Sequence, residues 1–431
     1  MYLRLIASDE EGALAQSPFA TVQRAVIGRR YTGGMILTPA KQAELQRALQ
    51  DAADDHALLS APPGLQPLAG TPPLPAQHIA DSELHIVRHK DSGCVQFVVP
   101  SAEQSLLPQG WDWIVQATLR STERMTQAMI ERVEEHNKPE RLLSLRHGYD
   151  QAATTAELAA ARGRKVLLLV HGVFSSSEGA FGALDLQPLL ERYEGRVFGY
   201  DHWTIAKTPQ RNALDLLLLL PANAGWEVDI ICHSRGGLVV RSLLSQAVAD
   251  VARARGGRIA KVGKAVFVAA ANQGSALASP DEIQHFLNVA AMLASFGNGM
   301  ALDLVIGLAR LVVSLGFGRP SVQALAAGSP LIAQLNGGAS LLTDANSYYA
   351  RANFDYGDSL LQHTGALLSR ALLDTANDMV VPYAGVLLPK AAPDASHMLS
   401  FGSAEQKQNQ VWHTEFFQQP ATRDFLLANL A

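Results

Sequence analysis

The sequence predicts an α/β fold in which helices flank a mostly parallel sheet. From Arg164 onward, apolar runs of strand length alternate with helical stretches, and each run is almost continuously apolar. Such runs are typical of parallel strands that are covered on both faces. Strands that alternate with helices form βαβ units with right-handed crossovers, and these units build a parallel sheet. Residues 1–150 follow a different pattern, which predicts a separate small α+β region.

Composition limits the kinds of protein that the chain can be. Its 431 residues are enough for one large domain and a smaller one. With 48% hydrophobic and 17% charged residues, wholesale disorder is excluded. A formal net charge of -5 without a basic stripe argues against a nucleic-acid partner. Cys94 and Cys232 form neither a disulfide framework nor a zinc pattern, so we expect no metal and no cofactor.

The region of residues 1–150 contains no motif with recognisable chemistry, and its role is not predicted. A Pro-rich stretch at residues 62–77 indicates a loop or linker. Around it we expect a helix at 38–55, a hairpin of strands at 83–90 and 94–100, and a long amphipathic helix at 111–137.

The larger domain, residues 151–431, supplies the parallel sheet. Its apolar runs predict strands, and the stretches between them predict helices. The expected strands are 165–170, 196–201, 226–232 and 264–270, and the expected helices are 209–220 and 237–254.

The stretch "DIICHSRGG", residues 229–237, predicts a nucleophile elbow. An apolar strand leads into Ser234, and two glycines and an apolar helix follow. The general pattern is Gly-x-Ser-x-Gly, in which the glycines let strand and helix approach while the serine takes a strained conformation. Here Cys232 replaces the first glycine. A serine that caps the N-terminus of the helix would use the same residue type, and this alternative stays open without partner residues.

An acyl-transfer site also needs two backbone N–H groups aimed at the oxyanion of the tetrahedral intermediate. The residue after the nucleophile, Arg235, would supply one of them. The second would come from the loop after the earlier strand 165–170, where Val173 follows a His-Gly pair. The side chain of Arg235, next to the nucleophile, could attract an anionic group, and a structural ion pair is the alternative role.

A base and an acid must complete the site. Asp378 heads the β-branched run "DMVVP", and His413 stands in a loop before the last amphipathic helix. Asp374 is the rival acid, and His397 and His363 are the rival bases. We expect Asp378 and His413 to act with Ser234.

Other polar residues stand after the expected strands and are candidates for the wall of a substrate pocket. Asp201 and His202 follow a strand, and we expect them to cap the next helix rather than to line the pocket. The pocket candidates are His171, Phe174, His233 and Asn272.

From 165 to its end the chain resembles a lipase/esterase-type α/β hydrolase, and most closely the bacterial lipase-like group found beside CHAT (caspase-like) modules. The resemblance implies the α/β-hydrolase fold and a Ser234–His413–Asp378 triad, with Val173 and Arg235 forming the oxyanion hole. Cys232 departs from the glycine of many lipases. The stretches that carry the resemblance are "LLVHGVFSSSEGAF", "YDHWTIAKTPQRNA", "HSRGGLVVRSLL", "AANQGSALA", "SPLIAQLNG" and "NDMVVP".

Residues 281–336 depart from the strand–helix alternation and predict a helical cap or lid. The segment is rich in Ala, Leu and Gly, which suits a pocket for an acyl chain and peripheral contact with a membrane. Within it, residues 300–317 approach the length of a membrane span, but Asp303 and Arg310 favour a buried helix. No signal peptide is evident, so we expect a cytoplasmic protein, with Sec-independent export as the open alternative, and the oligomeric state is not predicted.

Together these observations predict a serine hydrolase that cleaves carboxylic esters, including lipids, through an acyl-enzyme. The same residues would serve a thioesterase, an amidase or a peptidase. A non-catalytic binding module on the same fold is the third hypothesis, because fold does not fix function.

Overall fold

The computed structural model describes residues 139–173, 175–246, 258–275, 320–355 and 375–430, together with Glu131, Glu134 and Val248. Ahead of these residues it describes the backbone of five strands: β1 (Tyr2–Leu5), β2 (Met35–Ile36), β3 (Ser82–His89), β4 (Cys94–Val98) and β5 (Trp111–Leu119). The chain divides into two compact units, and one of them comprises Glu134–Ser279, Pro320–Asp355 and Arg370–Ala431. The sequence places the domain boundary near residue 150.

The first five strands form a sheet in the order β1-β5-β3-β4-β2, and each pair is antiparallel. The expected hairpin is confirmed as β3 and β4. The expected long helix at 111–137 is wrong in its first part, because Trp111–Leu119 is the strand β5. Apolar residues stand at every second position of "WDWIVQATL", and this is a strand period. The expected helix at 38–55 and the Pro-rich stretch at 62–77 lie outside the described residues.

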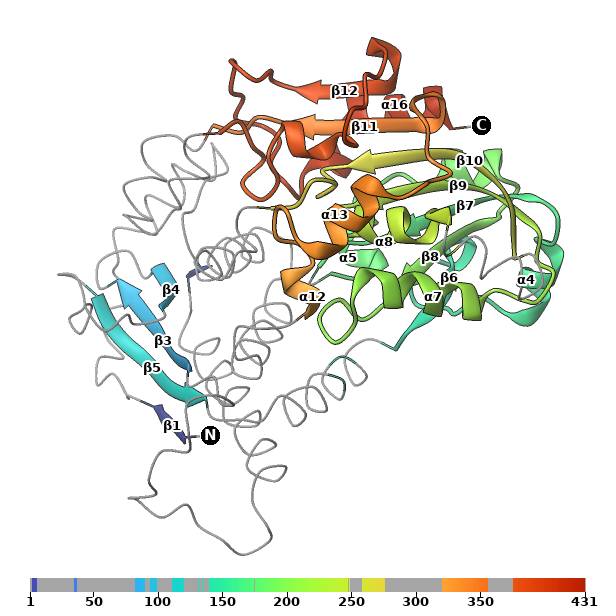
Figure 1. Ribbon diagram of the computed structural model, residues 1–431. Helices are drawn as coiled ribbons and strands as arrows, with labels where there is room; N and C mark the ends of the chain where they lie inside the picture. The colour runs from blue at the N-terminus through green and yellow to red at the C-terminus, as the bar shows by residue number, and fades with distance from the viewer. Residues whose placement is uncertain are drawn as a thin grey trace, which may run out of the picture. The chain divides into compact units, whose positions relative to one another are not determined.

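Seven of the described strands form a second sheet, drawn from green to red in Figure 1. All neighbours in this sheet are parallel except β6, which pairs antiparallel with β8 at one edge. In sheet order the strands are β12 (Met398–Phe401), β11 (Ser347–Ala352), β10 (Ile259–Val268), β9 (Trp226–His233), β7 (Lys165–Val170), β8 (Val197–Asp201) and β6 (Arg141–Ser144).

The four central strands of this sheet, β10, β9, β7 and β8, are confirmed where the apolar runs predict them. The sequence did not reveal β6 and β12, which form the two edges of the sheet, or β11, which lies between β10 and β12. The β-branched run that follows Asp378 is a turn and not a strand. An edge strand buries less apolar surface than a central one, so its sequence pattern is weaker.

Helices connect the strands and cover the sheet (Figure 1). The described helices of this unit are α4 (Thr155–Ala160), α5 (Ser177–Phe181), α6 (Gln187–Arg192), α7 (Pro209–Leu219), α8 (Gly236–Leu243), α12 (Pro320–Gln323), α13 (Pro330–Gly337) and α16 (Pro420–Asn429). Short 3₁₀ helices are η2 (Leu145–His147), η5 (Asp344–Asn346), η7 (Ala384–Val386), η8 (Ala395–His397) and η9 (Phe416–Gln418).

The period of two in the strands divides the core between the two faces of the sheet. On one face, Leu167 and Leu169 belong to a buried cluster with Phe181 of α5, Leu189 of α6 and Leu426 of α16. The alternate residues of the same strands face α8, which contacts both β7 and β9 and packs on α7. The arrangement is therefore helix layer, sheet, helix layer.

A mostly parallel sheet of this strand order, flanked by helices on both faces, is the α/β-hydrolase fold, and the predicted fold class is confirmed. Most of the expected cap, residues 281–319, lies outside the described residues, while α12 and α13 form its described end. No helix within the described ranges has the length and the apolar character of a membrane span.

Candidate active site

Ser234 stands at a sharp turn between β9 and α8. Its φ of 56° lies in the left-handed region, which non-glycine residues seldom adopt. Its backbone N–H donates to Val268 O (3.2 Å), and its carbonyl accepts from the N–H of Ala271 (3.1 Å), so the end of β10 holds the turn on both sides. The alternative that Ser234 caps the helix is wrong, because α8 begins at Gly236 with Arg235 at the N-cap.

Glycines next to the turn allow the helix to approach the sheet. A Cβ on Gly236 would lie 2.4 Å from Val170 O, and a Cβ on Gly237 would lie 2.7 Å from Ala270 Cβ. Neither distance leaves room for a side chain. Cys232 at the end of β9 is fully buried, and burial raises the pKa of its thiol well above the usual range, so it packs as a small apolar residue.

The loop after β7 lies directly against Ser234. A Cβ on Gly172 would come within 2.7 Å of Ser234 Cβ and 3.2 Å of Ser234 Oγ. The close approach follows from the sheet, because β7 and β9 are parallel neighbours with Val170 paired to Cys232. Val173 follows in this loop, whereas the pocket candidate Phe174 lies outside the described residues.

His171 orients the peptide group between Gly172 and Val173. The backbone N–H of His202 donates to His171 Nε2 (3.2 Å), so the proton of the neutral ring is on Nδ1, which donates to Gly172 O (2.9 Å). In a planar trans peptide the C=O of Gly172 and the N–H of Val173 point in opposite directions. The fully buried His171 ring therefore fixes the direction of the Val173 N–H.

His202 packs against His171, and Asp201 caps α5, so neither residue caps α7. The His202 ring stacks between His171, at 4.0 Å between ring centroids, and Tyr200, at 4.9 Å. The Asp201 carboxylate accepts from the N–H of Ser177 (2.8 Å) and so caps α5. Thr208 caps the next helix, α7, and the expected capping of α7 by Asp201 and His202 is therefore wrong.

His413 and Asp378, on loops that follow β12 and β11, meet in a buried pair. His413 Nδ1 lies 2.9 Å from Asp378 Oδ2, and the side chains are 6% and 1% exposed. The backbone N–H of His413 also donates to Asp378 O (3.0 Å). A carboxylate only accepts, so Nδ1 carries a proton, and in the neutral form of this tautomer Nε2 presents a lone pair. This arrangement can orient an imidazole as a general base.

The second carboxylate oxygen of Asp378 is held by its own loop. Oδ1 accepts the backbone N–H groups of Val380 (3.0 Å) and Val381 (2.7 Å). The segment after β10 anchors the same loop, because Ser275 Oγ donates to Val380 O (2.6 Å) and Asn272 Nδ2 donates to Val386 O (2.7 Å). Asn272, a pocket candidate, is fully buried and holds the acid loop.

The rival base His397 is engaged elsewhere. It lies in η8, its Nδ1 is 2.9 Å from Asp344 O, and its ring packs on Tyr348 at 4.2 Å. The other rivals, Asp374 and His363, lie outside the described residues.

The side chain of His233 turns inward beneath His413. Its Nε2 lies 2.8 Å from the carbonyl oxygen of His413, and the two ring centroids are 4.8 Å apart. Burial, followed by the nearby His413 and His171, lowers the pKa of His233 to about 3, so the ring is neutral near pH 7. The sequence placed His233 in the substrate pocket, and nothing in its spacing indicated this contact.

The Arg235 guanidinium is fully buried and anchors the start of α8. Its Nη2 donates to Lys207 O (2.5 Å) and to Asn212 Oδ1 (3.0 Å). Burial lowers the pKa of Arg235 to about 10, against the attraction of Glu134 and Tyr200, so it stays charged at neutral pH. The guanidinium is therefore structural, and only the backbone N–H of Arg235 remains for a role beside Ser234.

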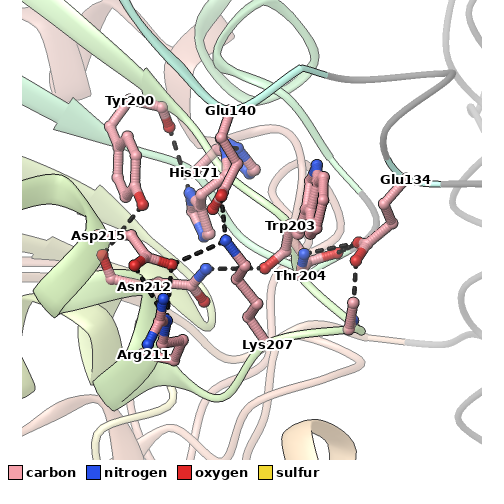
Figure 2. Close-up of polar contacts among 12 residues, drawn as sticks. Glu134, Glu140, His171, Tyr200, Trp203, Thr204, Lys207, Arg211, Asn212 and Asp215 are labelled. Atoms are coloured by element: carbon pink, nitrogen blue, oxygen red, sulfur yellow. Dashed lines mark hydrogen bonds and ion pairs between the residues drawn. The ribbon is translucent and has the colours of Figure 1, made fainter. Parts of the chain in front are cut away.

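The loop that accepts from Arg235 belongs to a network of charged groups (Figure 2). Glu134 Oε1 accepts the N–H groups of Thr204 (2.6 Å) and Ile205 (3.1 Å), and Oε2 accepts that of Ala206 (2.8 Å). The sequence did not single out Glu134, because a glutamate in a helical stretch usually faces solvent.

Lys207 occupies the centre of the same view (Figure 2). Its Nζ pairs with Glu140 and with Asp215 (2.8 Å) and lies 4.5 Å above the Trp203 ring. Burial alone would lower the pKa of this ammonium, but the two carboxylates outweigh burial and raise it. Among the described residues, no group of three or more His, Cys, Asp or Glu side chains could hold a metal ion.

One comparison with known protein families covers most of the chain. A family model described as "Domain of unknown function (DUF7379)" matches residues 135–431, a span that includes Ser234, Asp378 and His413. No curated protein matches the chain.

Several solved lipases are similar to the chain at low identity. The Bacillus licheniformis lipase BlEst2 in its mature form is 17% identical, with 61% of this chain and 89% of that chain covered and a TM-score of 0.36. Lipase 1 from Pelosinus fermentans is 13% identical, with 59% and 96% covered and a TM-score of 0.38. The Staphylococcus hyicus lipase is 13% identical, with 62% and 92% covered and a TM-score of 0.36.

Proposed function

The chain belongs to the family described as a domain of unknown function (DUF7379), and we propose that it is a serine hydrolase that cleaves carboxylic esters. Ser234 is the nucleophile, His413 the general base and Asp378 the acid that orients the base. The observation that carries the proposal is the buried hydrogen bond from His413 Nδ1 to Asp378 Oδ2, 2.9 Å long, in a fold that strains Ser234 at the turn after β9.

The first half of the reaction forms an acyl-enzyme. Ser234 Oγ attacks the ester carbonyl carbon while its proton passes to Nε2 of His413, and the C=O bond opens to an oxyanion. The imidazolium that forms is stabilised by the Asp378 carboxylate, because that carboxylate already accepts the Nδ1–H. The intermediate then collapses, the alcohol leaves with the proton from Nε2, and the acyl group stays on Ser234 Oγ.

Water completes the cycle by the same groups. His413 takes a proton from a water molecule, the hydroxide attacks the acyl carbonyl, and Ser234 leaves with the proton from His413. The N–H groups of Val173 and Arg235 stabilise the oxyanion in both halves. The bond from His171 Nδ1 to Gly172 O, which orients the Val173 N–H, and the anchored Arg235 side chain support this role.

The test is the hydrolysis of p-nitrophenyl esters from short to long acyl chains by the wild type and by Ser234→Ala. We expect turnover that falls on the order of 10⁴-fold or more in the variant, because loss of a triad member removes most of the acceleration. A fluorophosphonate should label Ser234 in the wild type alone, as peptide mass spectrometry would show. Full turnover by Ser234→Ala would overturn the proposal.

A comparison of leaving groups separates an esterase from the rival acyl hydrolases. A panel of matched thioester, amide and peptide substrates with the same acyl group compares kcat/KM across the leaving groups. We expect the ester to have the highest value. If Ser234 is labelled but another leaving group has the highest kcat/KM, the proposed triad stands and the proposed ester substrate does not. An unlabelled, inactive protein would indicate a binding module.

A further inference from the structure

His233 links the nucleophile strand to the loop of the proposed base. It is the last residue of β9 and directly precedes Ser234, yet its side chain is buried and not directed to solvent. Its Nε2 lies 2.8 Å from the carbonyl oxygen of His413, 180 residues away in sequence. The two rings are tilted by 45° with centroids 4.8 Å apart.

The direction of this hydrogen bond follows from its chemistry. A carbonyl oxygen only accepts, so His233 Nε2 must carry the proton and donate. Burial lowers the pKa of His233 to about 3, so the ring does not gain a second proton near neutral pH. Its Nδ1 is then an acceptor, for which no hydrogen-bond partner exists among the described residues. Leaving the buried Nδ1 acceptor unpaired costs free energy. The Nε2 donor, and not the Nδ1 acceptor, is therefore the useful polar group of this ring.

The hydrogen bonds described for His413 divide between two anchors. Its backbone N–H donates to Asp378 O (3.0 Å), and its ring Nδ1 donates to Asp378 Oδ2 (2.9 Å), so both contacts tie His413 to the acid loop. The bond from His233 to the carbonyl of His413 instead ties it to the strand that ends at Ser234. The two Asp378 contacts fix the base relative to the acid, and the His233 contact fixes the acid–base pair relative to the nucleophile.

We propose that His233 is a positioning residue that, by donating from Nε2 to the backbone carbonyl of His413, holds the base in register with Ser234. The inference rests on the proposed function and adds a residue to it. In this role His233 acts through the backbone of His413 and not on the reacting atoms. Misplacement of reacting groups by about 1 Å costs on the order of 10²-fold in rate, so a single backbone contact of this kind has a measurable effect.

Three substitutions separate the donor from the shape and the polarity of the ring. His233→Gln places an amide N–H near the position of Nε2, His233→Asn places one near Nδ1, and His233→Phe keeps a ring without a donor. We expect kcat for p-nitrophenyl esters to stay within about 3-fold of wild type in Gln and to fall roughly 10- to 100-fold in Asn and Phe. KM should change little, because the contact acts on the transition state and not on the substrate.

A spectroscopic measurement tests the same inference without turnover. The Nδ1 proton between His413 and Asp378 should give a low-field proton resonance in wild type and Gln, and this resonance should broaden or vanish in Asn and Phe. Thermal unfolding of each variant identifies any that fail to fold. A folded His233→Phe with wild-type kcat and resonance would overturn the inference, as would a folded His233→Gln that is as slow as Phe. Failure of the proposed function is distinct, because the wild type itself would then lack Ser234-dependent turnover and labelling.

Discussion

Ser234 holds a backbone conformation that costs a non-glycine residue roughly 1–2 kcal/mol. Its neighbours maintain the strain: β10 binds its N–H and its carbonyl, and Gly172 approaches its side chain from the adjacent loop. Residues kept in sparsely populated backbone regions cluster at functional sites, where surrounding structure over-determines them. Ser234 therefore differs from an ordinary serine in the strained turn that holds it, and not in its side chain.

The contact between Gly172 and Ser234 predicts a defect in activity. Gly172→Ala would place a methyl group 2.7 Å from Ser234 Cβ, so the nucleophile or the loop must shift. We expect kcat/KM for p-nitrophenyl esters to fall on the order of 10²-fold. Gly337→Ala is the matched control, because its added Cβ would meet nothing within 4 Å. Equal activity in the two variants would contradict this account of the turn.

Burial of His233 predicts a pH dependence of stability. The folded state holds the pKa of His233 at about 3, whereas the unfolded chain binds a proton near the ordinary value of 6.5. The neutral ring therefore stabilises the fold fully above pH 6.5, and this contribution is lost as pH falls toward 3, at up to about 1.4 kcal/mol per pH unit. His233→Gln lacks the titrating group, so its free energy of unfolding should fall less steeply between pH 6.5 and 4 in urea titrations. Parallel pH slopes for the two proteins would count against the buried neutral ring.

Among the connecting elements, the loop of residues 203–207 joins three parts of the domain. Glu134 binds its amides, Ser321 of α12 donates from Oγ to Ile205 O, and the guanidinium of Arg235 binds Lys207 O. Each of these partners is distant in sequence from the other two. The loop therefore connects the start of the domain and the described end of the expected cap to the residue next to Ser234.

The Glu134 contacts predict a loss of stability that an exposed glutamate should not share. Glu134→Gln exchanges one of the accepting oxygens for an NH₂ group that faces backbone donors, and we expect a loss of about 1–3 kcal/mol in the free energy of unfolding. Glu227→Gln is the matched control, because Glu227 pairs with Lys261 at the surface, where ion pairs contribute little. Chemical denaturation of both variants at pH 7 decides the matter. Similar, small losses in both would show that the Glu134 carboxylate does not organise the loop.

For the whole molecule, the parallel sheet explains why distant residues converge. The carboxyl ends of parallel strands lie at one edge of the sheet, so the segments after β7, β9 and β10 meet there. His171, Ser234 and Asn272 follow these three strands. The site is thus a property of the sheet's topology and not of any single segment.

The start of the sheet predicts where the domain can be cut. A chain beginning at Gln151 would lack β6 and with it the buried Leu142 and Leu143, and β8 would become an exposed edge. Each lost leucine removes about 1.5–3 kcal/mol of the free energy that apolar burial contributes to stability. We therefore expect this chain to unfold at lower temperature or to aggregate. A chain beginning at Glu131 keeps β6 and should retain phosphonate labelling. Equal unfolding temperatures for the two chains would refute the structural role of β6.

Local sequence patterns were sufficient for the central elements of this fold. The runs that became β7, β8, β9 and β10 are apolar because both of their faces are covered, and burial of this kind is visible in sequence. The edge strands β6 and β12 were missed, since a strand at an edge is less completely covered. The inner strand β11 was also missed, because Arg351 interrupts its apolar run. The pattern at 111–119 fitted two periods, and the pairing of β5 with β1 and β3 decided between them.

The sequence by itself determined the fold class and the chemical types of the candidate residues: a serine before two glycines after an apolar run, and an Asp and a His in the later loops. The tertiary structure alone decided that Asp378 pairs with His413, that His397 does not, and that His233 and Arg235 turn inward as anchors. The physical reason is distance along the chain. Periodicity reports local burial, whereas a hydrogen bond between residues 180 positions apart depends on where the whole sheet brings their loops.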